Sequence, residues 1–203
     1  MIHRIISLII RLIMYANGGL KVIGRDKIPL QGGVIVAPNH ISYLDPPVIG
    51  AVLPRKATFM ARKGLFDIPI LGWSIRYYAF PVDREKTHPS TIKETVRRLK
   101  NGELLVIFPE GKRSETGKLL EGKRGIGMIA RLSNVPIVPA LIKGTNNALP
   151  VGAKWLRRAG VTVIFDTPIL PSALLDEKSK NTSEDITQKI MDSIKEIEKT
   201  ICR

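Results

Sequence analysis

Cysteine and histidine are scarce in this chain of 203 residues, and their scarcity excludes several kinds of site. The one cysteine, Cys202, lies next to the C-terminus, which rules out a disulfide framework and a cysteine-rich zinc site and favours a reducing compartment. Of three histidines, His3 lies in the first apolar segment and His88 just before a predicted helix. His40 is therefore the one candidate for acid/base chemistry, and no zinc site is expected.

Carboxylates are outnumbered, with 18 acidic against 32 basic residues and a net charge of +14. Such an excess indicates an anionic partner: nucleic acid, an anionic membrane surface or a phosphorylated substrate. Aromatic residues make up only 5% of the chain, and it contains no RNP-like run, zinc finger or lysine-rich tail. Because the sequence contains none of these nucleic-acid-binding motifs, we do not expect nucleic acid to be the partner.

Long apolar runs are also missing. The most apolar stretch, residues 1–15, is too short to span a bilayer, and Arg11 interrupts it. Arg11 and the lack of an A-x-A site make it a poor signal peptide. On a helix, His3, Arg4, Ser7 and Arg11 share one narrow face and isoleucines cover most of the rest. The pattern predicts a helix that lies in a membrane interface with its arginines towards headgroups, or one that packs on the domain core.

The familiar signatures of several enzyme classes are absent. No G-x-x-x-x-G-K-[ST] loop occurs, and no G-x-G-x-x-G follows a predicted strand. No serine lies in a G-x-S-x-G elbow, and there is no H-E-x-x-H. The sequence therefore gives no support to a P-loop nucleotidase, a Rossmann dehydrogenase, an α/β-hydrolase or a zinc protease.

Apolar strands alternate with amphipathic helices along the chain. The predicted strands are 21–23, 34–36, 57–61, 77–82, 104–108, 135–142 and 161–165, and the predicted helices are 47–53, 65–75, 89–100, 122–132 and 183–201. This order predicts a single α/β domain with a largely buried mixed or parallel sheet flanked by helices. We divide the chain into a membrane-associating helix at 1–20 and a domain at 21–203. Pro139 predicts an edge, bulge or strand-end position within its strand.

A turn after the strand at 34–36 contains both a histidine and an aspartate. The carboxylate of Asp45 could bind one ring nitrogen of His40 and leave the other free as a base. Asp45 also precedes Pro46, which predicts a helix N-cap at Asp45 with proline at the first helical position. The alternative is purely structural, with Asp45 as a cap and His40 as a packed side chain.

Other charged residues follow other predicted strands: Lys63, Arg84, Glu110 and Arg113. Because sites in α/β sheets gather at the carboxyl ends of strands, we expect these residues and His40 to form one site. The planar guanidinium of Arg113 suits a phosphate, and Glu110 could hold Arg113 or bind a hydroxyl. The alternative is a set of solvated turns with isolated ion pairs.

Four blocks of sequence resemble the glycerophosphate/lysophosphatidate acyltransferase family. NHISYLD at 39–45 matches its NHxxxxD block, and FPEGKRS at 108–114 is similar to its FPEGTRS block, with lysine in place of threonine. AFPVDR at 79–84 and VPIVPA at 135–140 resemble its second and fourth blocks. The blocks come in family order within about residues 34–145. Tyr78 replaces a glycine of the second block. Bacterial 1-acyl-sn-glycerol-3-phosphate acyltransferases are the most similar members.

The resemblance implies a glycerol-3-phosphate acyltransferase-like fold and a set of roles. His40 would be the general base and Asp45 would orient it. The acceptor phosphate would bind Arg84, Arg113 and Lys63, and the residues that position the substrate would be Glu110, Gly111 and Asn39. An acyl group would pass from acyl-CoA or acyl-carrier protein, as co-substrate, to the 2-hydroxyl of lysophosphatidate. The resemblance implies no metal and no other cofactor.

The implied substrates also bear on location, because both carry long acyl chains. We expect a peripheral, monotopic enzyme at the cytoplasmic face of the cell membrane, attracted to anionic lipids. Two alternatives remain open: an acyltransferase of this fold with another lysophospholipid or lipid acceptor, and a non-catalytic basic protein that binds membrane or nucleic acid. Loss of acyl transfer in His40→Ala would exclude the second.

Overall fold

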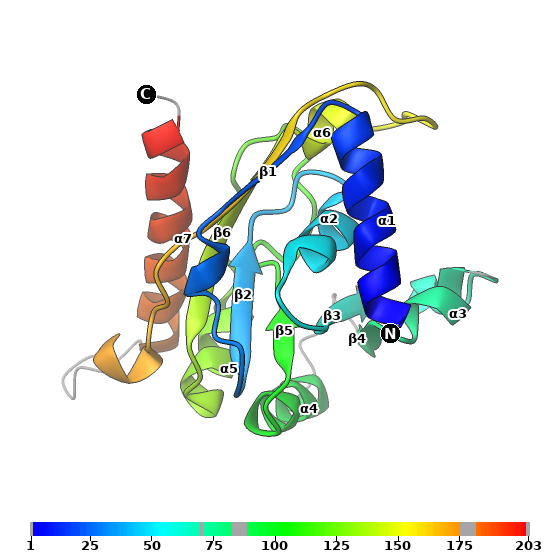
Figure 1. Ribbon diagram of the computed structural model, residues 1–203. Helices are drawn as coiled ribbons and strands as arrows, with labels where there is room; N and C mark the ends of the chain where they lie inside the picture. Colours follow the sequence, from blue (N-terminus) through cyan, green and yellow to red (C-terminus); the bar gives the residue numbers. More distant parts are fainter. Residues whose placement is uncertain (1, 70, 83–88, 175–181, 202–203) are drawn as a thin grey trace.

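A seven-stranded sheet with helices on both faces forms the protein (Figure 1). The structure is a computed structural model that describes residues 2–69, 71–82, 89–174 and 182–201. The strands are β1 (Leu20–Ile23), β2 (Val34–Pro38), β3 (Ala57–Arg62), β4 (Ala79–Val82), β5 (Leu104–Val106), β6 (Ile137–Lys143) and β7 (Val161–Phe165). The helices are α1 (Ile2–Ala16), α2 (Asp45–Val52), α3 (Leu71–Ile75), α4 (Pro89–Lys100), α5 (Arg124–Ser133), α6 (Thr145–Ala148) and α7 (Thr182–Ile201), with short 3-10 turns η1 (Arg25–Lys27), η2 (Lys63–Leu65) and η3 (Pro171–Leu174).

The strand order is β1-β7-β6-β2-β5-β3-β4, and every neighbouring pair is parallel except β6 and β7. In register, Val36 of β2 lies between Val106 of β5 and Val138 of β6. The carboxyl ends of β2, β3, β4, β5 and β6 therefore meet at one edge of the sheet. The predicted α/β fold with a mixed sheet is confirmed.

The central strand β2 explains why both faces of the sheet are covered. All five of its residues are buried. Because side chains alternate along a strand, Val34 and Val36 belong to one hydrophobic cluster, and Ile35 and Ala37 to the other. A strand with two apolar faces requires helices on both sides of the sheet.

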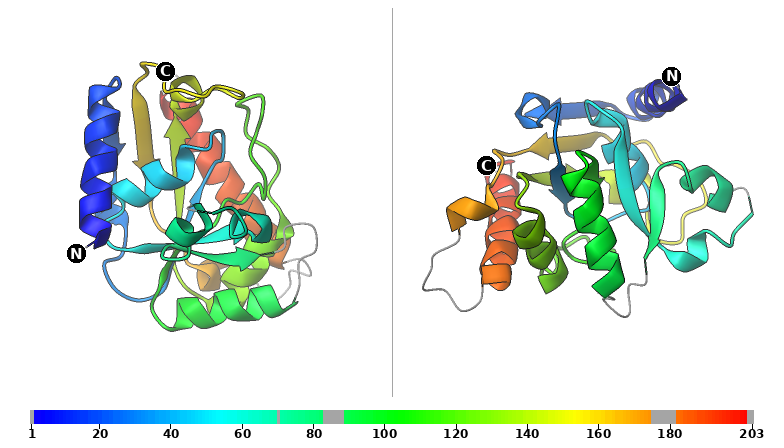
Figure 2. Two further views of the ribbon diagram at one scale, coloured as in Figure 1. Left: turned by 90° about the vertical axis from the view of Figure 1, so that its right-hand side faces the viewer. Right: turned by 90° about the horizontal axis from the view of Figure 1, so that it is seen from below.

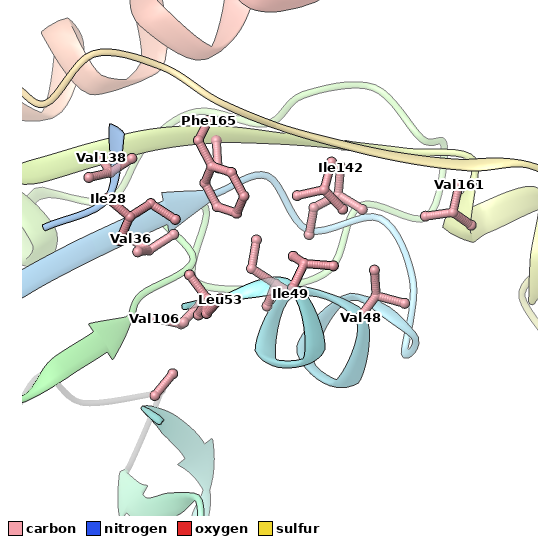
Figure 3. Packing of buried hydrophobic residues seen from close by; sticks show 14 of the residues in the cluster. Ile28, Val36, Val48, Ile49, Leu53, Val106, Val138, Ile142, Val161 and Phe165 are labelled. Atoms are coloured by element: carbon pink, nitrogen blue, oxygen red, sulfur yellow. The ribbon is translucent and has the colours of Figure 1, made fainter. Parts of the chain in front are cut away.

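The two helical layers differ in composition. Helices α1 and α2 cover one face, where Val48 and Ile49 of α2 belong to the same buried cluster as Phe165 (Figure 3). Helices α4, α5 and α7 cover the other (Figure 2, right). The α7 residues Ile186, Ile190 and Ile194 are fully buried, so the apolar face predicted for the last helix packs on the domain core.

One predicted element differs clearly from the structure: the predicted helix at 65–75 is replaced by η2 and the short helix α3. Strand β6 is an inner strand of the sheet, so Pro139 does not lie on an edge. The carbonyl of Pro139 accepts a hydrogen bond from the N–H of Asp166, and two residues earlier Ile137 exchanges both backbone hydrogen bonds with Ile169. Between these contacts the partner segment has one residue more than β6, which is a bulge, one of the positions predicted for Pro139.

Helix α1 turns part of its polar stripe inward, while Arg4 is exposed. Ser7 is buried, and Arg11 Nε donates a hydrogen bond of 2.7 Å to the carbonyl of Ala51 in α2. Leu8 and Leu12, by contrast, are more than half exposed. The arginines were expected to face lipid headgroups if the helix lay in an interface; instead Arg11 binds α2. In the described ranges no helix combines the length and apolar character needed to cross a bilayer.

Candidate active site

A histidine and an aspartate form a buried pair in the turn between β2 and α2. The Nδ1–H of His40 donates to Oδ2 of Asp45 over 2.8 Å, and the two side chains are 8% and 0% exposed. With Nδ1 as the donor to a carboxylate, Nε2 carries the free lone pair. Nε2 has no hydrogen-bond partner within the described part of the chain. An imidazole held in this way can act as a general base.

Asp45 accepts hydrogen bonds from four donors, three at Oδ2 and one at Oδ1. Besides His40, the N–H groups of Ile41 and Ser42 donate to Oδ2 over 2.6 and 2.7 Å, and the hydroxyl of Thr145 donates to Oδ1 over 2.6 Å. Each contact acts on the negative charge, which makes these hydrogen bonds stronger than neutral ones.

The predicted N-cap at Asp45 is wrong. Helix α2 begins at Asp45 with Leu44 at the N-cap position, and no side chain caps the helix. The carboxylate points back to the turn before the helix, where it binds the N–H groups of Ile41 and Ser42. Asp45 therefore stabilises the turn that carries His40, and the prolines that follow it start α2 without a side-chain cap.

An aromatic ring also packs against the face of the His40 imidazole. The ring of Phe108 stacks on that of His40 with centroids 4.1 Å apart and an interplanar angle of 24°. Phe108 follows β5, the neighbour of β2, so the parallel sheet brings the two rings together. Stacking and the Asp45 contact together restrict both the tilt and the rotation of the ring.

Glu110, in the turn after β5, is linked by a hydrogen bond to the turn after β2 that contains His40. Its Oε1 accepts from the N–H of His40 over 2.7 Å, and its Oε2 accepts from the N–H of Leu120 over 2.9 Å. Burial raises the pKa of Glu110, while these two N–H groups favour its charged form. Among the described residues Glu110 forms no ion pair with Arg113, so the pairing considered from the sequence is absent there.

Asn39 performs a similar task on the other side of His40. Its side-chain N–H donates to the carbonyl of Ile142 over 3.0 Å, and its carbonyl oxygen accepts from the N–H of Ile142 over 2.7 Å. Ile142 lies in β6, so Asn39 attaches the turn to the neighbouring strand. Both polar atoms of its amide therefore bind β6, and the substrate-positioning role that the resemblance implies for Asn39 stays a prediction.

Two of the three predicted phosphate ligands, Lys63 and Arg113, follow strands at the same edge of the sheet. Arg113 lies over the ring of Tyr43, with Cζ 3.9 Å from the centroid, directly beside the His40 turn. Lys63 begins η2 after β3 and is exposed. Arg84 lies outside the described residues. Gly111 has a φ of +69°, a conformation that favours glycine, at the turn after β5.

An apolar cavity of about 150 Å³ opens beside Phe108, on the side of the sheet covered by α4 and α5. Its walls include Met60 of β3, Ile92 of α4 and Ile126 of α5. Pro109 and Gly111 also line it, so the cavity reaches the turn that contacts His40. No motif predicted it, because its walls come from distant segments.

Comparison with known proteins places the chain in a family. A family model described as acyltransferase matches residues 19–143. A 1-acyl-sn-glycerol-3-phosphate acyltransferase of Bacillus subtilis is 31% identical over 191 residues, which cover 93% of each chain. This chain belongs to the acyltransferase family. The resemblance drawn from its motifs is confirmed.

Two further members of the family are similar. A 1-acyl-sn-glycerol-3-phosphate acyltransferase of Streptococcus pneumoniae is 36% identical over 169 residues, which are 80% of this chain and 60% of that protein. The crystal structure of the 1-acyl-sn-glycerophosphate (LPA) acyltransferase, PlsC, from Thermotoga maritima matches with a TM-score of 0.83 at 27% identity. That match covers 99% of this chain and 80% of the other. The family fold therefore extends beyond the motifs, over nearly the whole chain.

Thr145 is the residue of the site that sequence reasoning missed. It follows β6, is fully buried, and reaches Asp45 from 100 positions away in the sequence. Nothing about a lone threonine at the start of a short helix signals this contact. Only the parallel pairing of β6 with β2 brings it to the His40 turn.

We expect Thr145→Val to lower acyl transfer while the fold persists, because valine keeps the shape and removes the hydroxyl donor to Asp45. A hydrogen bond to a charged group contributes about 1.5–3 kcal/mol, so the rate should fall about tenfold to a hundredfold. Thr145→Ser restores the hydroxyl and should restore most of the rate. The measurements are kcat across pH and the midpoint of thermal unfolding. Equal rates for the valine and serine variants would contradict a role through Asp45.

Proposed function

We propose that the chain transfers an acyl group from acyl-CoA or acyl-carrier protein to the 2-hydroxyl of 1-acyl-glycerol-3-phosphate, giving phosphatidate. The observation that carries this proposal is the buried His40–Asp45 pair with Nε2 of His40 free. The relatives named above, whose titles state this activity, support the choice of acceptor.

In the proposed reaction, Nε2 of His40 removes the proton of the acceptor hydroxyl as its oxygen attacks the thioester carbonyl. The C–S bond then breaks, and the imidazolium returns the proton to the departing thiolate. Asp45 stabilises the imidazolium through Nδ1–H. General base catalysis of this kind contributes about a hundredfold to ten-thousandfold to the rate.

The reaction proceeds directly, without an acyl-enzyme. The serine nearest in sequence to His40 is Ser42, and its hydroxyl donates to the carbonyl of Leu149 and accepts from the N–H of Leu44. Those bonds hold the hydroxyl as a structural group. The oxygen of the acceptor is then the nucleophile that His40 activates.

The acceptor phosphate binds Arg113, with Lys63 and Arg84 as further ligands. Stacking on Tyr43 fixes the guanidinium plane of Arg113 beside the His40 turn. A planar group held in this way can bind two phosphate oxygens with little further loss of side-chain freedom. Part of the acyl chain of the donor lies in the apolar cavity beside Phe108. This cavity is suited to the chain because Phe108, one of its walls, also stacks on His40.

The enzyme acts at the surface of the membrane, at its cytoplasmic face where acyl donors are made. Leu8 and Leu12 of α1, Trp73 of α3 and Trp155 in the segment 149–160 all expose more than half of their area. Figures 1 and 2 place α1, α3 and that segment on the same side of the molecule. Large exposed apolar side chains on one side fit an interface with lipid, and the basic net charge adds attraction to anionic headgroups.

His40→Ala tests the reaction itself. Without the imidazole we expect transfer to fall by about a hundredfold or more, with unfolding temperature little changed. Purified protein is assayed for free thiol release from acyl-CoA and from acyl-carrier protein, with lysophosphatidate in detergent, and phosphatidate is identified by mass spectrometry. No release by the unchanged protein with either donor would refute the proposal. Thiol release only with a different lysophospholipid would support acyl transfer but refute lysophosphatidate as the acceptor.

Arg113→Ala tests the phosphate site. We expect KM for lysophosphatidate to rise about tenfold or more, with KM for the acyl donor unchanged, because a charged fork to phosphate is lost. Lys112→Ala is the matched control, since it removes one positive charge from an exposed neighbour in the same turn. An equal rise in KM for lysophosphatidate in both variants would mean that net charge causes the effect, and it would refute Arg113 as a phosphate ligand.

The two tryptophans test the membrane-facing side. They are the only ones in the chain, and Trp73 and Trp155 are 82% and 83% exposed. Binding to phosphatidylglycerol vesicles should shift their emission to shorter wavelength, and brominated lipid should quench it. Trp73→Phe and Trp155→Phe assign the signal to one ring each. Unchanged emission on vesicles that demonstrably carry the protein would show that another side faces the bilayer.

A further inference from the structure

A second, strongly basic cavity lies at the opposite end of α2 from the His40–Asp45 pair. It has a volume of about 560 Å³ and lies between the first half of α1 and the residues that follow α2. Asp45 begins α2 and Leu53, in the wall of this cavity, follows its last residue. An eight-residue helix is about 12 Å long, so the cavity is separate from the proposed catalytic centre.

The charged side chains that line this cavity are all basic. They are Arg4, Arg11, Arg25, Arg55 and Lys56, with His3 beside them. No carboxylate lines the cavity. In the described part of the chain none of the five cations forms an ion pair with an acidic residue. A cluster of like charges is destabilising unless an anion joins it.

The protein positions three of these cations through backbone carbonyls, which leave their charge in place. Arg11 donates to Ala51 over 2.7 Å, and Arg25 donates to Leu53 over 3.4 Å. Arg55 donates through Nη1 to Gly102 over 2.9 Å and through Nη2 to Gly32. Its buried Nε has no acceptor among the described residues. The cations are therefore held in place without being neutralised, which is how an anion site is preorganised.

The electrostatics at His3 agree with this picture. Its pKa is lowered by partial burial first and then by the charges on Lys56 and Arg11. Its imidazole thus reports a positive potential at the cavity wall. A bound anion would offset that potential, so the same ring can serve as a probe of occupancy.

We propose that this cavity binds the phosphate group of an anionic membrane lipid. Leu8 of α1 lines it and is 56% exposed, so the cavity opens where α1 presents apolar side chains to the outside. A lipid could place its phosphate among the arginines and its acyl chains along those side chains. Part of the polar stripe of α1 faces inward because it forms one wall of this site. The inference rests on the proposed membrane association and is independent of the transfer chemistry.

Arg4→Gln/Lys56→Gln tests the site by vesicle binding. Both residues line the cavity, and neither donates a hydrogen bond to a backbone carbonyl in the described ranges. The matched control is Lys154→Gln/Arg158→Gln, which removes two exposed charges from the segment 149–160 on the same side of the molecule. On phosphatidylcholine vesicles with phosphatidylglycerol, we expect the cavity variant to bind about tenfold more weakly than the control variant. Equal weakening in both would mean a general surface attraction and would overturn the proposal.

His3 provides the second measurement, since the chain has three histidines whose ring signals can be followed separately by NMR. Adding dihexanoyl phosphatidate should raise the pKa of His3, and inorganic phosphate at the same concentration should raise it less. A product bound only at the acceptor site would perturb His40 and leave His3 unchanged, which would overturn the proposal. Equal shifts with both probes would identify a free-phosphate site and overturn the lipid assignment. Failure of the unchanged protein to bind any vesicle would instead refute the proposed membrane association.

Discussion

The charge on Asp45 is the interaction on which the site depends. Four donors from two segments converge on one buried carboxylate: the His40 ring and two N–H groups of the same turn, and Thr145 from beyond β6. A buried charge is costly unless hydrogen bonds replace the lost water, and here three donors reach Oδ2 and one reaches Oδ1. The same bonds that make the charge tolerable also fix the turn. Orientation of His40 is therefore a consequence of satisfying Asp45.

The parallel sheet supplies these partners because it gathers chain segments at one edge. Glu110 follows β5 and Thr145 follows β6, and these strands flank β2, after which His40 lies. Each neighbour contributes one contact that no local sequence could supply: Glu110 binds the N–H of His40, and Thr145 binds Asp45. Phe108 adds the stacked ring. The site is rigid because three adjacent strands, themselves buried on both faces, carry it.

Local signals predict much of the fold and only part of the site. Helix α4 and strand β7 have the predicted bounds, 89–100 and 161–165, because a proline start, a glycine stop and an apolar run are local features. His40, Asp45 and Glu110 could be selected as polar residues after buried strands. Their contacts could not be predicted, since Glu110 reaches His40 across 70 positions and Thr145 reaches Asp45 across 100. The cap expected at Asp45 failed for the same reason: partners in the turn and beyond β6 engage its oxygens instead.

Helix α1 shows how one chain can meet two opposed requirements. A base that works on lipids must be rigid and dry, yet its substrates reside in a bilayer. The helix contributes Met14 to the core and binds α2 through Arg11, while Leu8 and Leu12 face outward. An amphipathic helix on a water-exposed surface would have the reverse orientation. The orientation of α1 therefore fits the membrane association proposed above, in which its outer face would meet an apolar phase and its inner cations an anion.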